Sequence, residues 1–158
     1  MLYEIVSERK VTYNAKIKTP EDVYDLLKRY ANAKKEQFIV VTVNGNHEPL
    51  SIRLVSTGLI NKTIVHPREV FYPAVQDLAT AVILCHNHPS DDLEPSAKDK
   101  GITKVLIAAG TIMGIHVLDH LIIGKSGYYS FRLNGRLPDE DEIRGMSLKD
   151  FMDDNTST

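Results

Sequence analysis

The hydrophobic residues of this chain recur at helical spacing in three segments, and short apolar runs separate these segments. The first, residues 19–35, would bury one helix face made of Val23, Leu26, Leu27 and Tyr30. The second, residues 66–78, places its apolar side chains on one face at Val70, Phe71, Ala74, Val75 and Leu78. The third begins at residue 96 and is expected to run to about residue 109, with Gly110 as its end. The pattern therefore predicts three helices.

Short runs rich in β-branched and aromatic residues lie between these helices and predict the strands of a sheet. The runs are Gln37 to Val43, Pro49 to Ser56, Ala81 to Cys85, Ile115 to Ile123 and Tyr128 to Leu133. A weaker alternation predicts an edge strand at Tyr3 to Val6. The run that ends at Cys85 contains no polar residue, which is typical of a strand buried on both faces. Helices that alternate with strands in this way indicate an α/β fold.

Composition and charge describe a soluble protein. The 158 residues are 42% hydrophobic and 25% charged, and the net charge is −2. With a pI near 6.3, the sequence shows no clear nucleic-acid patch. The single cysteine, Cys85, cannot form an internal disulfide, and its place in an apolar run predicts a core residue rather than a nucleophile. Neither a signal peptide nor a stretch of about 20 apolar residues is apparent, so we expect a cytoplasmic protein without a membrane segment.

The composition changes after Gly135. Acidic residues gather at Asp139 to Glu142, and the last residues, 153–158, are polar. We therefore predict a folded domain over residues 1–135 and an acidic, loosely ordered tail over residues 136–158. The sequence does not indicate an oligomeric state.

Two histidines and an aspartate stand between the end of the apolar run Ala81 to Cys85 and the first turn of the third helix. His86 and His88 are two residues apart, so an extended backbone would direct both side chains to one side. Asp99 follows about one turn into the predicted helix. Two imidazoles and a carboxylate are a ligand set of catalytic zinc sites, which keep a fourth position for water. Zinc lowers the pKa of such a water to about 7, so the residues indicate metal-assisted hydrolysis.

A second interpretation of these residues needs no metal. Ser96 and Asp99 have the spacing of a capping box, in which both side chains satisfy free N–H groups at the start of a helix. The two histidines would then be neighbours in a polar loop. The histidine pair, the carboxylate and the strand end together favour the metal site, and its chemistry needs a base elsewhere in the chain.

The wider sequence around these residues carries a resemblance to a known family. The pattern runs His86-x-His88-Pro89, six further residues, Ser96, two further residues and Asp99. It resembles the zinc motif of JAMM/MPN-domain metalloproteases. Val65 to Phe71 and Leu118 to Gly124 resemble the RadC-type branch of that family, so the similarity covers roughly residues 19 to 135. The helix-hairpin-helix segment of longer members is not seen before these motifs, and we expect a short form without it.

The resemblance implies a fold, a metal and an activity. The fold is the α/β sandwich shared with cytidine deaminases, a curved mixed sheet flanked by helices. One zinc ion per chain would be bound by His86, His88 and Asp99. Glu36 occupies the place of the family's general base and acid, and Ser96 that of the serine that helps to stabilise the oxyanion. The implied reaction is cleavage of a peptide or isopeptide bond in a protein or peptide substrate by a metal-bound hydroxide.

Several positions keep more than one interpretation. Glu48 and Glu69 are alternatives to Glu36 as the base. Asp119 and His120 recur in the resembling family, so they either support the zinc ligands from behind or make structural hydrogen bonds.

Two further expectations concern backbone and strand geometry. Simple alternation places Asp119 on the same strand face as Val117 and Leu121. Asp91 stands where the family usually has glycine, and aspartate accepts a left-handed backbone better than most residues.

Two functional hypotheses follow from the sequence. The first is a zinc metallopeptidase or isopeptidase. The second is a metal-bearing binding module without turnover, for protein recognition or for the DNA repair that the RadC name suggests. A zinc deaminase is excluded, because that chemistry needs His-x-Glu and Pro-Cys-x-x-Cys and this chain has a single cysteine.

Overall fold

The strands form one mixed sheet. A computed structural model describes residues 8–9, 16–58 and 65–146, and within them the sheet has six strands in the order β1-β3-β2-β4-β5-β6. They are β1 (Glu8–Arg9), β2 (Gln37–Val43), β3 (Pro49–Thr57), β4 (Ala81–Asn87), β5 (His116–Gly124) and β6 (Gly127–Ser130). β4 and β5 are parallel and the other neighbours are antiparallel. The strand predicted at Tyr3 to Val6 lies outside the described residues.

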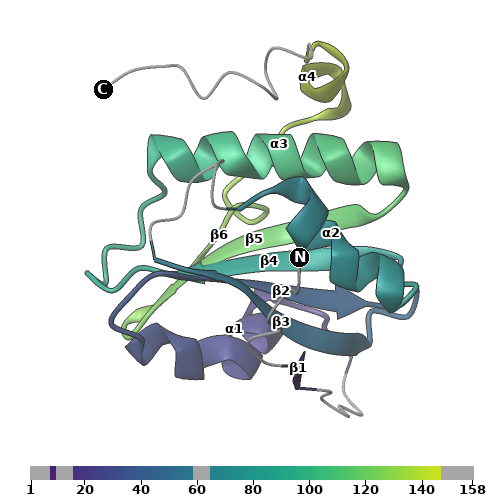
Figure 1. Cartoon of the computed structure of the whole chain (residues 1–158). Coiled ribbons are helices and arrows are strands. Elements are labelled where there is room, and N and C mark those ends of the chain that lie inside the picture. The colour runs from purple at the N-terminus through teal and green to yellow at the C-terminus, as the bar shows by residue number, and fades with distance from the viewer. Residues whose placement is uncertain (1–7, 10–15, 59–64, 147–158) are drawn as a thin grey trace.

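Helices cover both faces of this sheet (Figure 1). They are α1 (Pro20–Leu27), continued by the 3₁₀ helix η1 (Lys28–Asn32), then α2 (Pro67–Gln76), α3 (Ala97–Met113) and α4 (Glu140–Arg144). α1 begins at a capping box between Thr19 and Asp22. It packs on one face of the sheet, whereas α2 and α3 pack on the other. The expected α/β architecture is confirmed.

The core consists of two apolar clusters, one on each side of the sheet. Phe38, Phe71 and Leu106 belong to the cluster beneath α2 and α3. Leu27 and Cys85 belong to the cluster beneath α1. β4 is buried over its whole length and runs past the predicted end at Cys85 to Asn87. Burial raises the pKa of the Cys85 thiol, which suits a core residue rather than a nucleophile.

Two sequence predictions about helix ends are wrong. α3 does not stop at Gly110 but continues to Met113, and Gly114 closes it with a φ of 69°. Gly110 is required by packing instead, because a Cβ there would lie 2.4 Å from the Ile115 carbonyl oxygen. Leu78 does not belong to the buried face of α2: it follows the helix with a φ of 50° and is 86% exposed.

The expected alternation along β5 is also wrong at its start. Val117 packs with the cluster beneath α2 and α3, whereas Leu121 packs with the cluster beneath α1. The cause is an irregularity in the pairing with β4, where Val82 pairs with Val117 but Ile83 pairs with Asp119. The inserted residue changes the face of every side chain that follows.

The C-terminal segment starts with defined structure. Gly135 takes a φ of 63°, and Asp139 then caps the short helix α4. α4 lies over α3 (Figure 1). Residues 147–158 of the predicted tail lie outside the described residues. Among the helices that the structure describes, none has the length and apolar character to cross a membrane.

Candidate metal centre and its pocket

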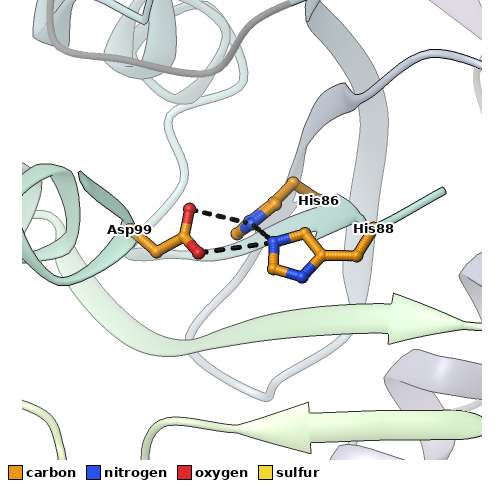
Figure 2. Close-up of side chains that lie close together, drawn as sticks. All are labelled: His86, His88 and Asp99. Carbon is orange, nitrogen blue, oxygen red and sulfur yellow. Dashed lines mark hydrogen bonds and ion pairs between the residues drawn. The ribbon is translucent and has the colours of Figure 1, made fainter. Parts of the chain in front are cut away.

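The side chains of the two histidines and the aspartate meet between the end of β4 and the start of α3 (Figure 2). His86 and His88 lie two residues apart at the end of β4, so both side chains leave the sheet on the same side. Asp99 occupies the third position of α3, within its first turn. The structure thus brings together the three residues that the sequence pattern predicted as ligands.

The three side chains converge at distances suited to one small cation. The His86 Nε2 atom lies 3.0 Å from the His88 Nε2 atom. Asp99 Oδ1 lies 3.2 Å from His86 Nε2, and Asp99 Oδ2 lies 3.3 Å from His88 Nε2. Ligands about 2.0–2.2 Å from a tetrahedral zinc ion are roughly 3.3 Å apart, so these atoms need little movement to hold one.

A chain of hydrogen bonds behind His86 determines which ring nitrogen carries its hydrogen. The Thr103 hydroxyl donates its only hydrogen to the Asp99 carbonyl, 2.6 Å away. The 2.6 Å contact between Thr103 Oγ1 and His120 Nδ1 must therefore use a hydrogen on His120. His120 Nε2 then accepts from His86 Nδ1, at 2.8 Å. This leaves the lone pair of His86 Nε2 directed at the centre.

His120 is suited to this task because it stays neutral. Its side chain is fully buried, with Phe131 stacked on the ring at a centroid distance of 4.9 Å. Burial, together with the neighbouring His86, holds the pKa of His120 well below its ordinary value. A neutral imidazole can donate at one nitrogen and accept at the other, as the chain requires.

His88 is oriented by the loop that follows it. Its Nδ1 lies 2.5 Å from the Asp92 carbonyl oxygen, which can only accept, so Nδ1 carries the hydrogen. The lone pair of His88 Nε2 therefore also faces the centre. The loop is held by a bond from the His88 amide to the Ile123 carbonyl, 3.0 Å. The Asp91 carboxylate adds a second tie by accepting the Ser126 amide at 3.1 Å.

Three acceptors that face one another with no donor between them require a positive charge. Burial lowers the pKa of His88, but the hydrogen bonds with Asp99 and with the Asp92 carbonyl, together with the negative charges of Asp99 and Glu36, outweigh it, so the pKa lies above its ordinary value. For Asp99 the directions are opposite: burial raises the pKa of its carboxyl group, and hydrogen bonds with His86 and His88 more than reverse this, so the pKa lies below its ordinary value. A proton can thus supply the charge in the metal-free protein. A divalent cation suits the two imidazoles and the carboxylate better, because all three can bind it at once.

An open pocket of about 370 Å³ lies in front of this centre, and its walls are mostly acidic or hydroxyl-bearing. The lining residues are Glu36, His88, Ser90, Asp92, Glu94, Ser96, Lys98 and Asp99. Both residues predicted to assist the reaction, Glu36 and Ser96, are therefore in the same pocket as the ligands.

Glu36 is half-buried immediately before β2. It lines the same pocket as His88 and Asp99, and its negative charge contributes to the raised pKa of His88. The alternatives are elsewhere. Glu48 accepts a hydrogen bond from Asn44 in the hairpin turn beyond the other end of β2, and Glu69 is in the exposed first turn of α2. Among the three glutamates, only Glu36 lines the described pocket.

Ser96 and Asp99 do form a capping box. Ser96 Oγ accepts from the Asp99 amide at 3.1 Å, and Asp99 Oδ2 accepts from the Ser96 amide at 2.7 Å. The first of these bonds uses an acceptor position of the Ser96 hydroxyl, so the hydroxyl hydrogen is available to the pocket. The two interpretations of this motif are therefore compatible, because the cap directs the Asp99 carboxylate at the two histidines.

Asp119 does not contact the ligands. Its carboxylate accepts hydrogen bonds from Ser130 Oγ at 2.5 Å and from the Arg132 amide at 3.0 Å. It therefore fixes the end of β6, on either side of the Phe131 ring that covers His120. Of the two residues considered for a supporting role, His120 bonds directly to the ligand His86, whereas Asp119 acts only through the segment that holds Phe131 against His120.

Sequence reasoning missed Thr103 and Asn87. Thr103 is four residues after Asp99 on the same helix, and this spacing could have drawn attention to it. Asn87 stands between the two histidines, and its side chain bonds to the segment that carries Glu36.

Comparison with known proteins identifies the family of this chain. The sequence model described as "RadC-like JAB domain" matches residues 17–136. The chain belongs to this RadC-like JAB domain family. A UPF0758 protein of Alkaliphilus metalliredigens is 48% identical over 118 residues, which are 74% of this chain and 51% of that protein.

Two further relatives extend this comparison. A UPF0758 protein of Symbiobacterium thermophilum is 46% identical over 119 residues, 75% of this chain and 51% of the relative. One of Geobacter sulfurreducens is 44% identical over 138 residues, 87% of this chain and 60% of the relative. The chain thus spans little more than half the length of these curated relatives.

Proposed function

We propose that this RadC-like JAB domain is a zinc-dependent hydrolase that cleaves a peptide or isopeptide bond. The observation that carries the proposal is the convergence of ligand atoms from His86, His88 and Asp99 beside a pocket that is lined by His88, Asp99 and Glu36. An open pocket beside the ligands is what a catalytic metal site needs and a closed structural site lacks.

The residues of the pocket divide the chemical work. His86, His88 and Asp99 would hold the zinc ion, which supplies Lewis acidity and lowers the pKa of water. Glu36 accepts a proton as the nucleophile forms and returns it to the leaving nitrogen. The Ser96 hydroxyl donates its hydrogen to the carbonyl oxygen as negative charge develops there. The hydrogen bonds from His120 and the Asp92 carbonyl keep both imidazoles in the required tautomer.

The first test is metal content by elemental analysis, on protein purified without added metal. We expect about one zinc per chain in the wild type, and little in Asp99→Ala, because a three-ligand site rarely survives the loss of one ligand. Wild-type protein that stays free of metal after dialysis against zinc would overturn the proposal.

The second test is turnover of a mixed library of fluorogenic peptides and ε-lysine-linked isopeptides. Glu36→Gln should keep the zinc and lose roughly 10²–10⁴-fold in rate. Glu69→Gln is the matched control, since this exposed glutamate lies outside the pocket. Metal-loaded wild type without turnover of any member would favour the binding-module hypothesis instead.

A further inference from the structure

The segment that carries Glu36 is held by one buried side chain, Asn87. The Asn87 Oδ1 atom accepts from the Gln37 amide at 2.7 Å. Its Nδ2 group donates to the Lys35 carbonyl at 3.1 Å and to the Ala33 carbonyl at 3.3 Å. Ala33 and Lys35 lie in the short connection between η1 and β2, and Gln37 is the first residue of β2. A single amide group therefore fixes the backbone on both sides of Glu36.

The side-chain oxygen of Asn87 and both of its side-chain N–H groups have hydrogen-bond partners. Its side chain is fully buried, its oxygen has an amide partner, and both of its N–H groups have carbonyl partners. The reversed amide would direct N–H at N–H and oxygen at two carbonyls, so only one orientation fits. The regular pairing of β2 with β4 ends at Phe38 and His86. Beyond that pair the Asn87 side chain replaces the backbone ladder.

The connection that Asn87 holds is irregular backbone. Residues 33–36 belong to neither helix nor strand. The Glu36 carbonyl accepts from the Gly58 amide at 2.8 Å, and this bond anchors Glu36 itself, between the residues that Asn87 holds. Asn87 is also the residue between His86 and His88, so three consecutive residues at the end of β4 and just after it present two proposed metal ligands and the support for the proposed base.

We propose that Asn87 is a positioning residue that couples the metal ligands to Glu36 and fixes the distance between them. This inference rests on the proposed function, in which Glu36 is the base. It adds that the base is held in place by the strand that carries the ligands. Replacement of Asn87 should therefore displace Glu36 and leave the three ligands where they are.

The experiment measures that displacement by nuclear magnetic resonance on the full chain. Cobalt(II) takes the place of zinc, and the pseudocontact shift of each backbone amide reports its position relative to the metal. In Asn87→Ala, the shift of the Glu36 amide should decrease while the shifts of residues early in α3 stay unchanged. In the metal-free protein, the Gln37 amide should exchange with solvent roughly tenfold faster, because its acceptor is lost.

Asn134→Ala is the matched control, since Asn134 also makes a side-chain bond to a backbone carbonyl, at Ser130, away from the pocket. If Asn87→Ala does not fold, as judged by thermal melting, Asn87→Thr repeats the test with a side chain suited to a strand that cannot span to Ala33. Unchanged Glu36 shift and unchanged Gln37 exchange would overturn the proposal. Changes spread evenly over β2 and β4 would also overturn it, because they would mean a general loss of structure.

Failure of the proposed function gives a different result. Wild-type protein that binds cobalt but hydrolyses no substrate removes the hydrolase assignment, and the displacement of Glu36 is still measured. Wild-type protein that binds no cobalt removes the metal centre, and with it the coupling proposed for Asn87.

Discussion

His86 and His120 share a hydrogen bond of 2.8 Å between Nδ1 of the first and Nε2 of the second. The direction of this bond is fixed from outside, because the Thr103 hydroxyl has already donated its hydrogen to the Asp99 carbonyl. The helix that supplies one ligand thereby determines the tautomer of another. Metal affinity should depend on residues that never touch the metal.

Thr103→Val tests this dependence. The change keeps the shape of the side chain but removes the acceptor of His120 Nδ1, so His120 can turn its hydrogen towards His86. We expect zinc affinity to fall about 10–100-fold, measured by competition with a chromogenic chelator. Thr111→Val is the control, since Thr111 makes the same bond to the fourth preceding carbonyl on the exposed side of α3. Equal affinities in the two variants would contradict the tautomer argument.

Ser96 should show two separable effects when it is replaced by alanine. Loss of the cap should lower the free energy of unfolding by about 1 kcal/mol, measured by urea denaturation of the metal-free protein. Loss of the hydroxyl hydrogen should lower kcat by roughly 10²–10³-fold. Thr19→Ala removes the corresponding cap of α1 and should change stability without changing kcat. A rate unaffected by Ser96→Ala would limit this residue to the capping role.

The sequence predicted best where the interactions are local. The helix starts, the hairpin of β2 and β3 and the apolar run of β4 depend on neighbouring residues, and the ligands are within one strand end and one helix turn. Two failures had different causes. The helix end expected at Gly110 is wrong because the left-handed cap stands at Gly114. The face expected for Val117 is wrong because it depends on how β5 pairs with β4, a partner distant in the chain.

The residues that orient the ligands and Glu36 could not be predicted from the sequence, because they also act through contacts between distant parts of the chain. Asn87 bonds with residues about fifty positions earlier in the chain, and His120 meets His86 only because β4 and β5 are neighbours. Spacing alone shows neither contact. The ligands could be recognised from their spacing, whereas the groups that orient them required the sheet.

Gly110→Ala should destabilise the domain although alanine is the better helix former. The added Cβ would lie 2.4 Å from the Ile115 carbonyl oxygen and 3.2 Å from the Phe71 ring. Because the closest atom belongs to the backbone, the C-terminal end of α3 would have to move, and we expect a loss of about 1–3 kcal/mol by urea denaturation. Gly145→Ala is the control: its Cβ would meet nothing closer than 3.5 Å. A stabilised Gly110→Ala variant would show that this close approach is absent in solution.

Zinc binding should weaken as the pH falls, and the weakening should begin at a pH higher than the pKa of an ordinary histidine. In the metal-free protein the pKa of His88 lies above its usual value of 6.5, so its Nε2 keeps a competing proton to a higher pH than a free imidazole would. Asp99 adds no such competition, because its pKa lies far below this range. Where one proton is displaced, affinity changes about tenfold per pH unit. Near pH 6, where little of the metal-bound water has ionised, calorimetry in buffers of different ionisation enthalpy should detect up to one proton released per zinc from His88; ionisation of that water adds to the release as the pH approaches 8 or so. Affinity that is constant over this interval would mean that His88 is already unprotonated and that the three acceptors face one another without a shared proton.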